Sequence, residues 1–205
     1  MLGLSPVISL VSLDGRSESA QTSKVSVGTT IVPRMAEISI PRADRPVMPE
    51  GYGLPSSTEG MLSWADVEAR LVPATCYWLA TVRPDGRPHV VPRWGVWLDG
   101  RFWYDGAPTT VHVRNLNANP ACSLNLENGT EAVIVEGESL ATEAPADTLG
   151  ARISAAFAKY HDLGYSPAAD AWAGDGGGGL RVLTPRRALA WFSFPADATR
   201  FRFDE

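Results

Sequence analysis

The 205-residue chain is poor in the residues that most often hold metals or form covalent catalysts. It has two cysteines, Cys76 and Cys122, and three histidines. No Cys-x-x-Cys pair and no cysteine–histidine ligand spacing occurs, so we expect no metal site. Each cysteine lies in an apolar, strand-like run, which favours two buried thiols in a reducing, cytoplasmic environment over a disulfide.

The chain also lacks an excess of basic residues and a long apolar run. Its formal net charge is −5, so it has no basic footprint for nucleic acid. Val7–Leu13 is apolar but too short to span a membrane, and Asp14, Arg16 and Glu18 follow it directly. We therefore expect neither a nucleic-acid partner nor a membrane segment.

The usual catalytic motifs are missing. There is no Gly-x-Ser-x-Gly nucleophile, no His-Glu-x-x-His zinc helix and no Gly-x-Gly-x-x-Gly opening a helix. Gly174–Gly179 is rich in glycine, but no Lys-Ser/Thr follows it, so we interpret it as a flexible excursion or lid instead of a phosphate loop. An enzyme with this inventory borrows its chemistry from a cofactor.

The length predicts one domain with a tail. Residues 1–50 are expected to be disordered or extended, with residues 1–34 open to interpretation as an upstream extension, and residues 51–205 form the domain. Four prolines between residues 41 and 55 are typical of an extended arm.

Strand and turn patterns dominate residues 75–128. The turns Pro84-Asp85-Gly86 and Asp99-Gly100 separate three apolar runs, and Asp-Gly between such runs predicts a hairpin. Ser63 begins a helix that ends near Leu71, with Asp66 completing a capping box. The expected strands are Thr75–Val82, Pro88–Leu98, Arg101–Tyr104, Ala121–Leu126, Glu131–Thr142, Gly179–Leu183, Ala188–Phe194 and an edge strand at Thr199–Phe203; two further helices are expected from Thr109 and from Asp147 to Tyr160.

These elements predict a mainly β (α+β) fold: a six- to seven-stranded antiparallel split β-barrel with two or three peripheral helices. Leu79–Pro92 and Val113–Pro120 resemble the opening hairpin and the helix of the pyridoxamine 5'-phosphate oxidase-like FMN-binding split-barrel family. The resemblance covers roughly Ser63 to Phe203 and includes the branch that uses the deazaflavin coenzyme F-420.

The resemblance implies a cofactor site in two parts. In the family the second strand lies along the flavin ring, and the strand and helix that follow hold the phosphate. The helix N-terminus around Thr109 and Thr110 suits a phosphate because it offers free N–H groups and the positive end of the helix dipole. The matching positions here are His89, Val90, Val91, Pro92, Arg93 and Trp94 for the ring, and Tyr104, Thr109, Thr110, His112 and Arg114 for the phosphate.

One departure from the family concerns charge. FMN-binding members usually carry an Arg-Lys pair in the first turn of this helix, where this chain has Val111 and His112. Each lost charged hydrogen bond is worth about 1.5–3 kcal/mol. Histidine replaces it only when protonated, and at pH 7 an ordinary imidazole is mostly neutral.

The resemblance implies an oxidoreductase that transfers hydride between coenzyme F-420 or FMN and a small conjugated substrate. The Trp-rich second strand and Thr199–Phe203 favour coenzyme F-420 as the cofactor, and FMN is the second candidate. The alternative is a non-catalytic split-barrel module that binds a flavin, haem or another planar ligand. Both interpretations expect a homodimer, and no proton donor is identified.

Several of these residues also have structural interpretations. A histidine in a strand, such as His89, is more often a structural residue than a catalyst. Arg93 is either a solvated strand residue or a pocket residue. Arg200 and Arg202 point the same way in a strand, so they form a solvated face or an anion-binding pair.

Overall fold

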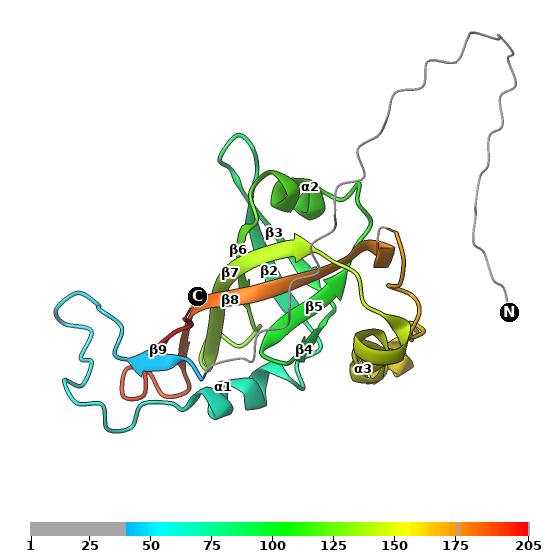
Figure 1. Ribbon diagram of the computed structural model, residues 1–205. Coiled ribbons are helices and arrows are strands. Elements are labelled where there is room, and N and C mark those ends of the chain that lie inside the picture. Colours follow the sequence, from blue (N-terminus) through cyan, green and yellow to red (C-terminus); the bar gives the residue numbers. More distant parts are fainter. Residues whose placement is uncertain (1–39, 176, 205) are drawn as a thin grey trace, which may run out of the picture. The chain divides into compact units, whose positions relative to one another are not determined.

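The computed structural model describes residues 40–175 and 177–204. The expectations for residues 1–34, including Val7–Leu13, lie outside the described residues. Within the described part, one antiparallel sheet of nine strands is accompanied by three α-helices (Figure 1). The predicted mainly β architecture with peripheral helices is confirmed, with more strands than the six or seven expected.

The sheet has the order β1-β9-β8-β7-β6-β2-β3, and β5 joins it by pairing with β8 and with β4. The strands are β1 (Arg42–Asp44), β2 (Tyr77–Val82), β3 (Pro88–Arg93), β4 (Val96–Leu98), β5 (Arg101–Asp105), β6 (Ala121–Asn125), β7 (Ala132–Ala141), β8 (Leu180–Trp191) and β9 (Thr199–Arg202).

The sheet branches at β8, which has two different partners along one of its edges. Along one edge β8 pairs with β7, while its other edge pairs first with β5, at Leu180–Leu183, and then with β9, at Arg187–Ala190. The barrel is therefore open and split. Figure 1 shows β8 as the long orange strand that runs beside β7.

The prediction of two closing strands, Gly179–Leu183 and Ala188–Phe194, is wrong, because β8 is continuous. Pro185 lacks an N–H, and the ladder accommodates it through a register shift between Glu136 and Gly137. A Cβ on Gly137 would lie 2.2 Å from the Thr184 carbonyl oxygen, so the close approach there requires glycine.

The predicted single run Pro88–Leu98 is also wrong, because it divides into β3 and β4. Between them, a Cβ on Gly95 would lie 2.3 Å from the ring of Phe102. The Gly95 backbone bonds to a side chain instead of a strand: its N–H donates to the Tyr160 hydroxyl (3.0 Å), and the Tyr160 hydroxyl donates to its carbonyl (2.8 Å).

The two predicted turns are confirmed. Asp99 and Gly100 both have positive φ, 53° and 64°, as a tight hairpin turn requires. Gly86 has φ 82°, and its N–H donates to the Arg83 carbonyl at 2.8 Å. Both hairpins follow from local chemistry.

Of the three predicted helices, two are regular. The first, α1 (Trp64–Leu71), has the predicted capping box of Ser63 and Asp66. The second, α2 (Val111–Ala118), begins after Thr110. The third is composite, with a π-helical turn η1 (Ala146–Gly150), α3 (Ala151–Ala156) and a 3-10 helix η2 (Phe157–Leu163). In Figure 1, α1 and α2 lie at opposite ends of the sheet.

The core has two parts because β5 and the first half of β8 are buried on both faces. Phe102 and Tyr104 point into the barrel cluster, whereas Trp103 between them joins a second cluster with Phe157 and Tyr160. Alternation along the strand sends neighbouring side chains to opposite faces. The segment from η1 to η2 therefore covers one side of β5.

β9 is not the edge strand predicted, because β1 pairs with it. Asp44 on β1 forms ion pairs with Arg200 (2.7 Å) and Arg202 (3.1 Å). Arg200 and Arg202 therefore form neither a solvated face nor a free anion-binding site, the two interpretations that the sequence allowed. The pair binds a carboxylate of its own chain.

In the segment expected to be a flexible excursion, Gly174–Gly179, the last three residues form the short turn η3 (Gly177–Gly179). A Cβ on Gly177 would lie 2.2 Å from the Thr142 carbonyl oxygen, and one on Gly179 would lie 2.5 Å from that of Gly106. All three glycines have positive φ. The glycines are needed for close backbone packing.

Candidate functional site

A buried polar cluster of His112, Arg93 and Gly106, which we call the polar hollow, lies where the first turn of α2 meets the ends of β3 and β5. His112, on α2, is 3% exposed, and its Nε2 has no hydrogen-bond partner. Arg93, at the end of β3, has a buried Nε that also lacks a partner. Such unsatisfied buried polar atoms are uncommon in folded proteins and call for a physical explanation.

Gly106, directly after β5, separates these two side chains. A Cβ built on Gly106 would lie 3.0 Å from His112 Nε2 and 3.5 Å from an Arg93 guanidinium nitrogen. These short distances show that the Gly106 backbone packs closely against His112 Nε2 and against the Arg93 nitrogen that donates to the Asp105 carbonyl. Both nitrogen groups lie near the N-terminus of α2, whose first N–H groups and positive dipole end favour a negative charge.

The surroundings of His112 are electropositive. Burial lowers the pKa of His112 to about 4, and the positive charges of Arg93 and Arg181, together with His89, add to that effect. The imidazole is therefore neutral at pH 7. Arg93 itself is held in place by donating to the Asp105 carbonyl, and it lies over the ring of Tyr104 at 5.8 Å.

Arg181 is a member of this region that the sequence interpretation missed. It is 3% exposed and donates to Asn117 Oδ1 on α2 (2.9 Å) and to the Ser139 carbonyl (2.9 Å). In residues 40–175 and 177–204 no carboxylate pairs with it. A buried charge without a counter-charge is costly and attracts anions. An arginine inside the apolar run Leu180–Leu183 was the signal available in the sequence.

Tyr104 connects these parts from the barrel interior. Its hydroxyl shares a 2.7 Å hydrogen bond with Ser139 Oγ, which also accepts from Arg181 Nε at 3.4 Å. Burial raises the pKa of Tyr104 to about 12. Tyr104 is thus a neutral spacer that fixes the geometry of Ser139 and Arg181.

The other residues expected at the phosphate lie differently. Arg114 is exposed, and its guanidinium donates to the Thr109 carbonyl at 2.7 Å. Thr110 Oγ1 donates to the Ala107 carbonyl at 2.8 Å, so this hydroxyl stabilises the turn before α2. The structure brings Arg93, His112 and Tyr104 together, and places Thr109 and Arg114 at the exposed rim.

The residues expected at the ring do not share one face. Along β3, His89, Val91 and Arg93 are half-buried, while Val90 and Pro92 are exposed. His89 Nδ1 lies 3.5 Å from Thr81 Oγ1, which accepts from Asn115 of α2 at 3.0 Å. β3 ends the strand order and pairs with β2 alone, so its other backbone edge has no strand partner among the described residues.

Trp94 follows β3 and is 42% exposed. Its ring stacks on Tyr160 with a centroid distance of 5.2 Å and an interplanar angle of 20°. Tyr165 lies beside it at 6.1 Å and donates to the Asp105 carboxylate, as does Trp172 Nε1 at 3.1 Å. The segment after β7 therefore builds an aromatic wall next to Arg93.

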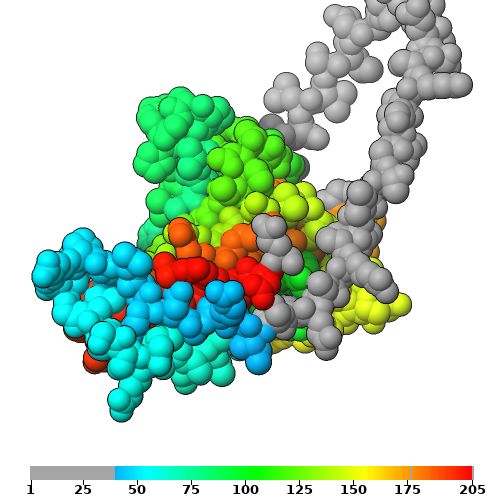
Figure 2. Space-filling model, turned by 60° about the vertical axis from the view of Figure 1, so that its left-hand side comes forward, coloured from blue at the N-terminus to red at the C-terminus, as the bar shows by residue number. Residues whose placement is uncertain are grey.

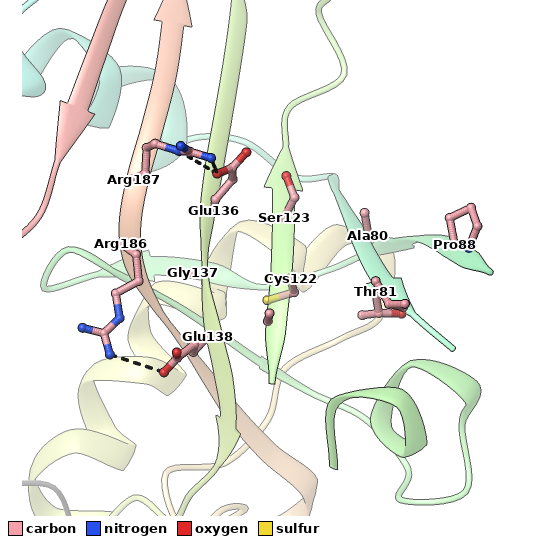
Figure 3. Close-up of a pocket in the computed structure, with 12 residues that line it drawn as sticks. Ala80, Thr81, Pro88, Cys122, Ser123, Glu136, Gly137, Glu138, Arg186 and Arg187 are labelled. Atoms are coloured by element: carbon pink, nitrogen blue, oxygen red, sulfur yellow. Dashed lines mark hydrogen bonds and ion pairs between the residues drawn. The ribbon is translucent and has the colours of Figure 1, made fainter. Parts of the chain in front are cut away.

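A separate open hollow of about 670 Å³ lies over β2, β6, β7 and β8 (Figure 3). Ala80 and Thr81 of β2 and Cys122 and Ser123 of β6 contribute to its lining. Two ion pairs, Arg187–Glu136 and Arg186–Glu138, lie along its β7–β8 side, as Figure 3 shows. None of the predicted site residues lines it, so the larger hollow and the polar hollow are distinct features.

A protein-family model described as pyridoxamine 5'-phosphate oxidase matches residues 64–192. Because this match spans more than half of the sequence, the chain belongs to the pyridoxamine 5'-phosphate oxidase family. A search of curated proteins finds no match. No helix among residues 40–175 and 177–204 has the length and apolar character that crossing a membrane requires.

Three solved structures illustrate the likeness. A conserved hypothetical protein from Mycobacterium tuberculosis is 22% identical, over 67% of this chain and 89% of its own, with a TM-score of 0.49. A FAD-binding protein from Mesorhizobium loti is 18% identical, over 70% and 96%, with a TM-score of 0.48. An F-420 reductase is 22% identical, over 77% and 97%, with a TM-score of 0.39. At these values the likenesses carry no conclusion about ligands.

Proposed function

We propose that the protein is an oxidoreductase that binds a flavin-type cofactor, coenzyme F-420 or FMN, and acts on a small conjugated substrate. The proposal rests on the family match over residues 64–192 and on two buried nitrogen atoms that lack partners, Arg93 Nε and His112 Nε2. A bound phosphate would supply acceptor oxygens for such nitrogens. When bound, such a cofactor supplies hydride transfer, which the side chains of this chain do not provide.

The residues of the hollow would bind and orient the phosphate. Arg93 offers a charged donor from a guanidinium already fixed by the Asp105 carbonyl, and His112 offers Nε2. Arg181 adds positive charge to the surroundings of His112. Since these groups come from three elements of a rigid barrel, the phosphate would be held in one position.

The free edge of β3 would bind the ring. Backbone N–H and C=O groups on an unpaired strand edge are ready hydrogen-bonding partners for a planar heterocycle. Trp94 and its aromatic wall would exclude water from one end of that edge. Together, β3 and the polar hollow would fix both ends of an elongated cofactor.

We also propose that the protein is a homodimer, joined through the face that carries the open hollow. Val82 and Val90 on the neighbouring strands are 42% and 54% exposed, and the two ion pairs give that face equal numbers of both charges. A neutral face with apolar strands suits contact with a second copy across a two-fold axis.

The test is a titration of the protein with FMN and with coenzyme F-420, followed by tryptophan fluorescence. We expect micromolar binding of one of them, reduced at least tenfold by Arg93→Gln and unchanged by Arg152→Gln. Arg152 is an exposed arginine that pairs with Asp99 away from the hollow. Binding of neither cofactor, or equal loss in both variants, would overturn the assignment.

The alternative function is a barrel that binds a flavin, haem or another planar ligand without turnover. The neutral His112 favours it, because a site with less fixed charge holds a phosphate less tightly. Tight binding of a reduced cofactor without hydride transfer to any of a panel of conjugated acceptors would select this alternative. Turnover with one acceptor would exclude it.

A further inference from the structure

A further pocket, of about 640 Å³, lies between the arm that precedes α1 (residues 45–62) and the turn that joins β8 to β9, at the end of the sheet away from α2 (Figure 1). We call it the aromatic pocket. Its lining includes Met48, Tyr52, Thr130, Trp191, Ser193 and Phe194. None of these residues lines the open hollow or belongs to the positions assigned to the cofactor.

We propose that the aromatic pocket binds a small, uncharged aromatic molecule that carries a hydroxyl or carbonyl group. The site goes beyond the proposed function, because it lies apart from the cofactor positions and needs none of them. Four observations carry the proposal: the size of the pocket, its fixed walls, its exposed aromatic rings and its uncharged, hydroxyl-bearing lining. Pockets of a few hundred cubic ångströms with aromatic walls and a few polar groups are typical of small-molecule sites.

Hydrogen bonds hold two walls of the aromatic pocket in place. The Arg45 guanidinium donates to the Ala196 carbonyl in the β8–β9 turn (2.9 Å) and to two carbonyls within the arm. The Asp197 carboxylate accepts from the N–H groups of Phe192 and Ser193, both at 2.9 Å. The arm and the turn are therefore fixed to each other and internally, so a ligand would not have to order them.

Three aromatic rings of the pocket lie edge to face. Tyr52 contacts Phe194 with a centroid distance of 6.4 Å and an interplanar angle of 89°, and Phe194 contacts Trp191 at 5.5 Å and 65°. Tyr52 and Phe194 are 53% and 41% exposed, so much of both rings faces solvent. Apolar surface gathered around a hollow is a mark of a binding site, and a flat ring would cover it.

The lining of the aromatic pocket is uncharged. Among the residues that the structure describes, no Asp, Glu, Lys or Arg lines it. Arg70 lies over the outer side of Phe192, with Cζ 4.6 Å from the ring centroid, and pairs with Glu131 at 2.8 Å. The Asp197 carboxylate is occupied by two backbone N–H groups. An ionised ligand would lose hydration here without gaining a free counter-charge, so the site favours a neutral one.

Three hydroxyl groups on the lining are available to a ligand. Tyr52, Thr130 and Ser193 make no side-chain hydrogen bond within residues 40–175 and 177–204. The Thr130 N–H donates to Asn128 Oδ1 at 2.9 Å, which fixes the turn that carries its hydroxyl. Since a hydroxyl both donates and accepts, a ligand hydroxyl or carbonyl would find a partner at the wall and the ring would be oriented.

The test uses the full-length protein and three probes that share one ring system: 1-naphthol, naphthalene and 1-naphthoate. The readout is the indole N–H signal of Trp191 in proton–nitrogen NMR, identified by its absence in Trp191→Phe. We expect 1-naphthol to shift this signal with a Kd on the order of 100 µM. At equal concentration, naphthalene, which lacks the hydroxyl, and 1-naphthoate, which is charged, should shift it less.

Variants assign the binding to the aromatic pocket. Tyr52→Ala and Phe194→Ala should each weaken 1-naphthol binding roughly three- to tenfold, because each removes one aromatic wall. The triple variant Tyr52→Phe, Thr130→Val and Ser193→Ala keeps the rings and removes the hydroxyls, so its responses to 1-naphthol and naphthalene should become equal. Leu163→Ala is the control, because Leu163 is 58% exposed on η2 and does not line the pocket.

Several outcomes would overturn the proposal. These are no saturable shift with 1-naphthol, the same loss of binding in Leu163→Ala as in Phe194→Ala, or binding of 1-naphthoate or of the cation phenyltrimethylammonium as tight as that of 1-naphthol. A 1-naphthol affinity that falls as the protein concentration rises would show that a second copy fills the pocket, and would overturn it too. Because the probes and variants leave the cofactor positions untouched, failure here would not affect the proposed function.

Discussion

At the scale of single residues, the polar hollow depends on the absence of a side chain at Gly106. Its backbone has no positive φ, so the glycine is not needed for the local fold. It is needed for space, because any side chain would lie against His112 Nε2 at 3.0 Å. Gly106 is thus the residue whose replacement tests the hollow with least disturbance elsewhere.

Gly106→Ala is expected to weaken binding of FMN or coenzyme F-420 at least tenfold, because the new methyl group would lie 3.0 Å from His112 Nε2 and 3.5 Å from an Arg93 guanidinium nitrogen. Stability should fall by about 1–3 kcal/mol, since the backbone accepts alanine but its methyl group would crowd the buried His112. Gly129→Ala is the matched control, as nothing lies within 4 Å of its Cβ. Equal affinities in the two variants, measured by fluorescence titration, would contradict the placement of the phosphate.

At the scale of elements, η3 shows how a glycine run serves packing. Gly179 approaches the Gly106 carbonyl, and its N-terminal neighbours approach Thr142 and Ala171 in the same way. The Gly106 N–H also donates to the Gly179 carbonyl at 3.1 Å. This turn therefore supports the backbone of Gly106, which belongs to the polar hollow.

Gly179→Ala is expected to destabilise the protein by roughly 2–4 kcal/mol, from left-handed strain and a 2.5 Å clash with the Gly106 carbonyl oxygen. Gly164→Ala has a similar positive φ but open space, so it should cost only about 1 kcal/mol. Urea denaturation of both variants gives the comparison. Equal losses would show that the close contact does not matter.

The pairing of β1 with β9 should depend on pH through Asp44. Hydrogen bonding to Arg200 lowers the pKa of Asp44 below its ordinary value of 3.8. The resulting stabilisation is fully present above pH 3.8 and is lost as the pH falls through the lower folded-state pKa.

Asp44→Asn should therefore cost about 0.5–1 kcal/mol at pH 7, and this difference from wild type should shrink toward pH 3. Urea denaturation at both pH values measures it. The variant Arg200→Gln, alone and combined with Asp44→Asn, completes a double-mutant cycle. A difference that stays constant between pH 7 and pH 3 would show that the ion pair does not stabilise the strand pairing.

At the scale of the whole molecule, the open face decides whether one chain is sufficient for function. The hollow over β2, β6, β7 and β8 borders Thr81, which also belongs to the hydrogen-bond chain from His89 to α2. A second copy on this face would therefore lie next to the elements that we assign to the cofactor. Association and cofactor binding should be linked.

Light scattering is expected to show a dimer, and Ala80→Arg on the open face should shift it to monomers. A stable interface needs about 800 Å² per partner, and an arginine in its middle would crowd the contact and bury an additional charge. Leu163→Arg is the control, because Leu163 is 58% exposed on η2 and away from this face. A wild-type monomer, or an unchanged dimer in Ala80→Arg, would rule this face out.

The sequence by itself determined the local elements. The Ser63–Asp66 capping box, the Asp99-Gly100 turn and the alternation along β2 act within a few residues, so they can be recognised without the fold. They were sufficient for the antiparallel class, the α1 and α2 positions and the resemblance to the family. At the site, Tyr104 and His112 were both predicted for the phosphate and do lie together, whereas Arg93 was predicted for the ring and lies beside them.

Only the tertiary structure decided the continuity of β8, the break at Gly95 and the composition of the polar hollow. Tyr160 lies 65 residues from Gly95 and replaces its strand partner. Arg181 meets α2 through Asn117, 64 residues away, and Arg93 and Arg181 help to keep His112 neutral. Burial and charge depend on residues that are distant in sequence, and no local pattern encodes which of them will meet.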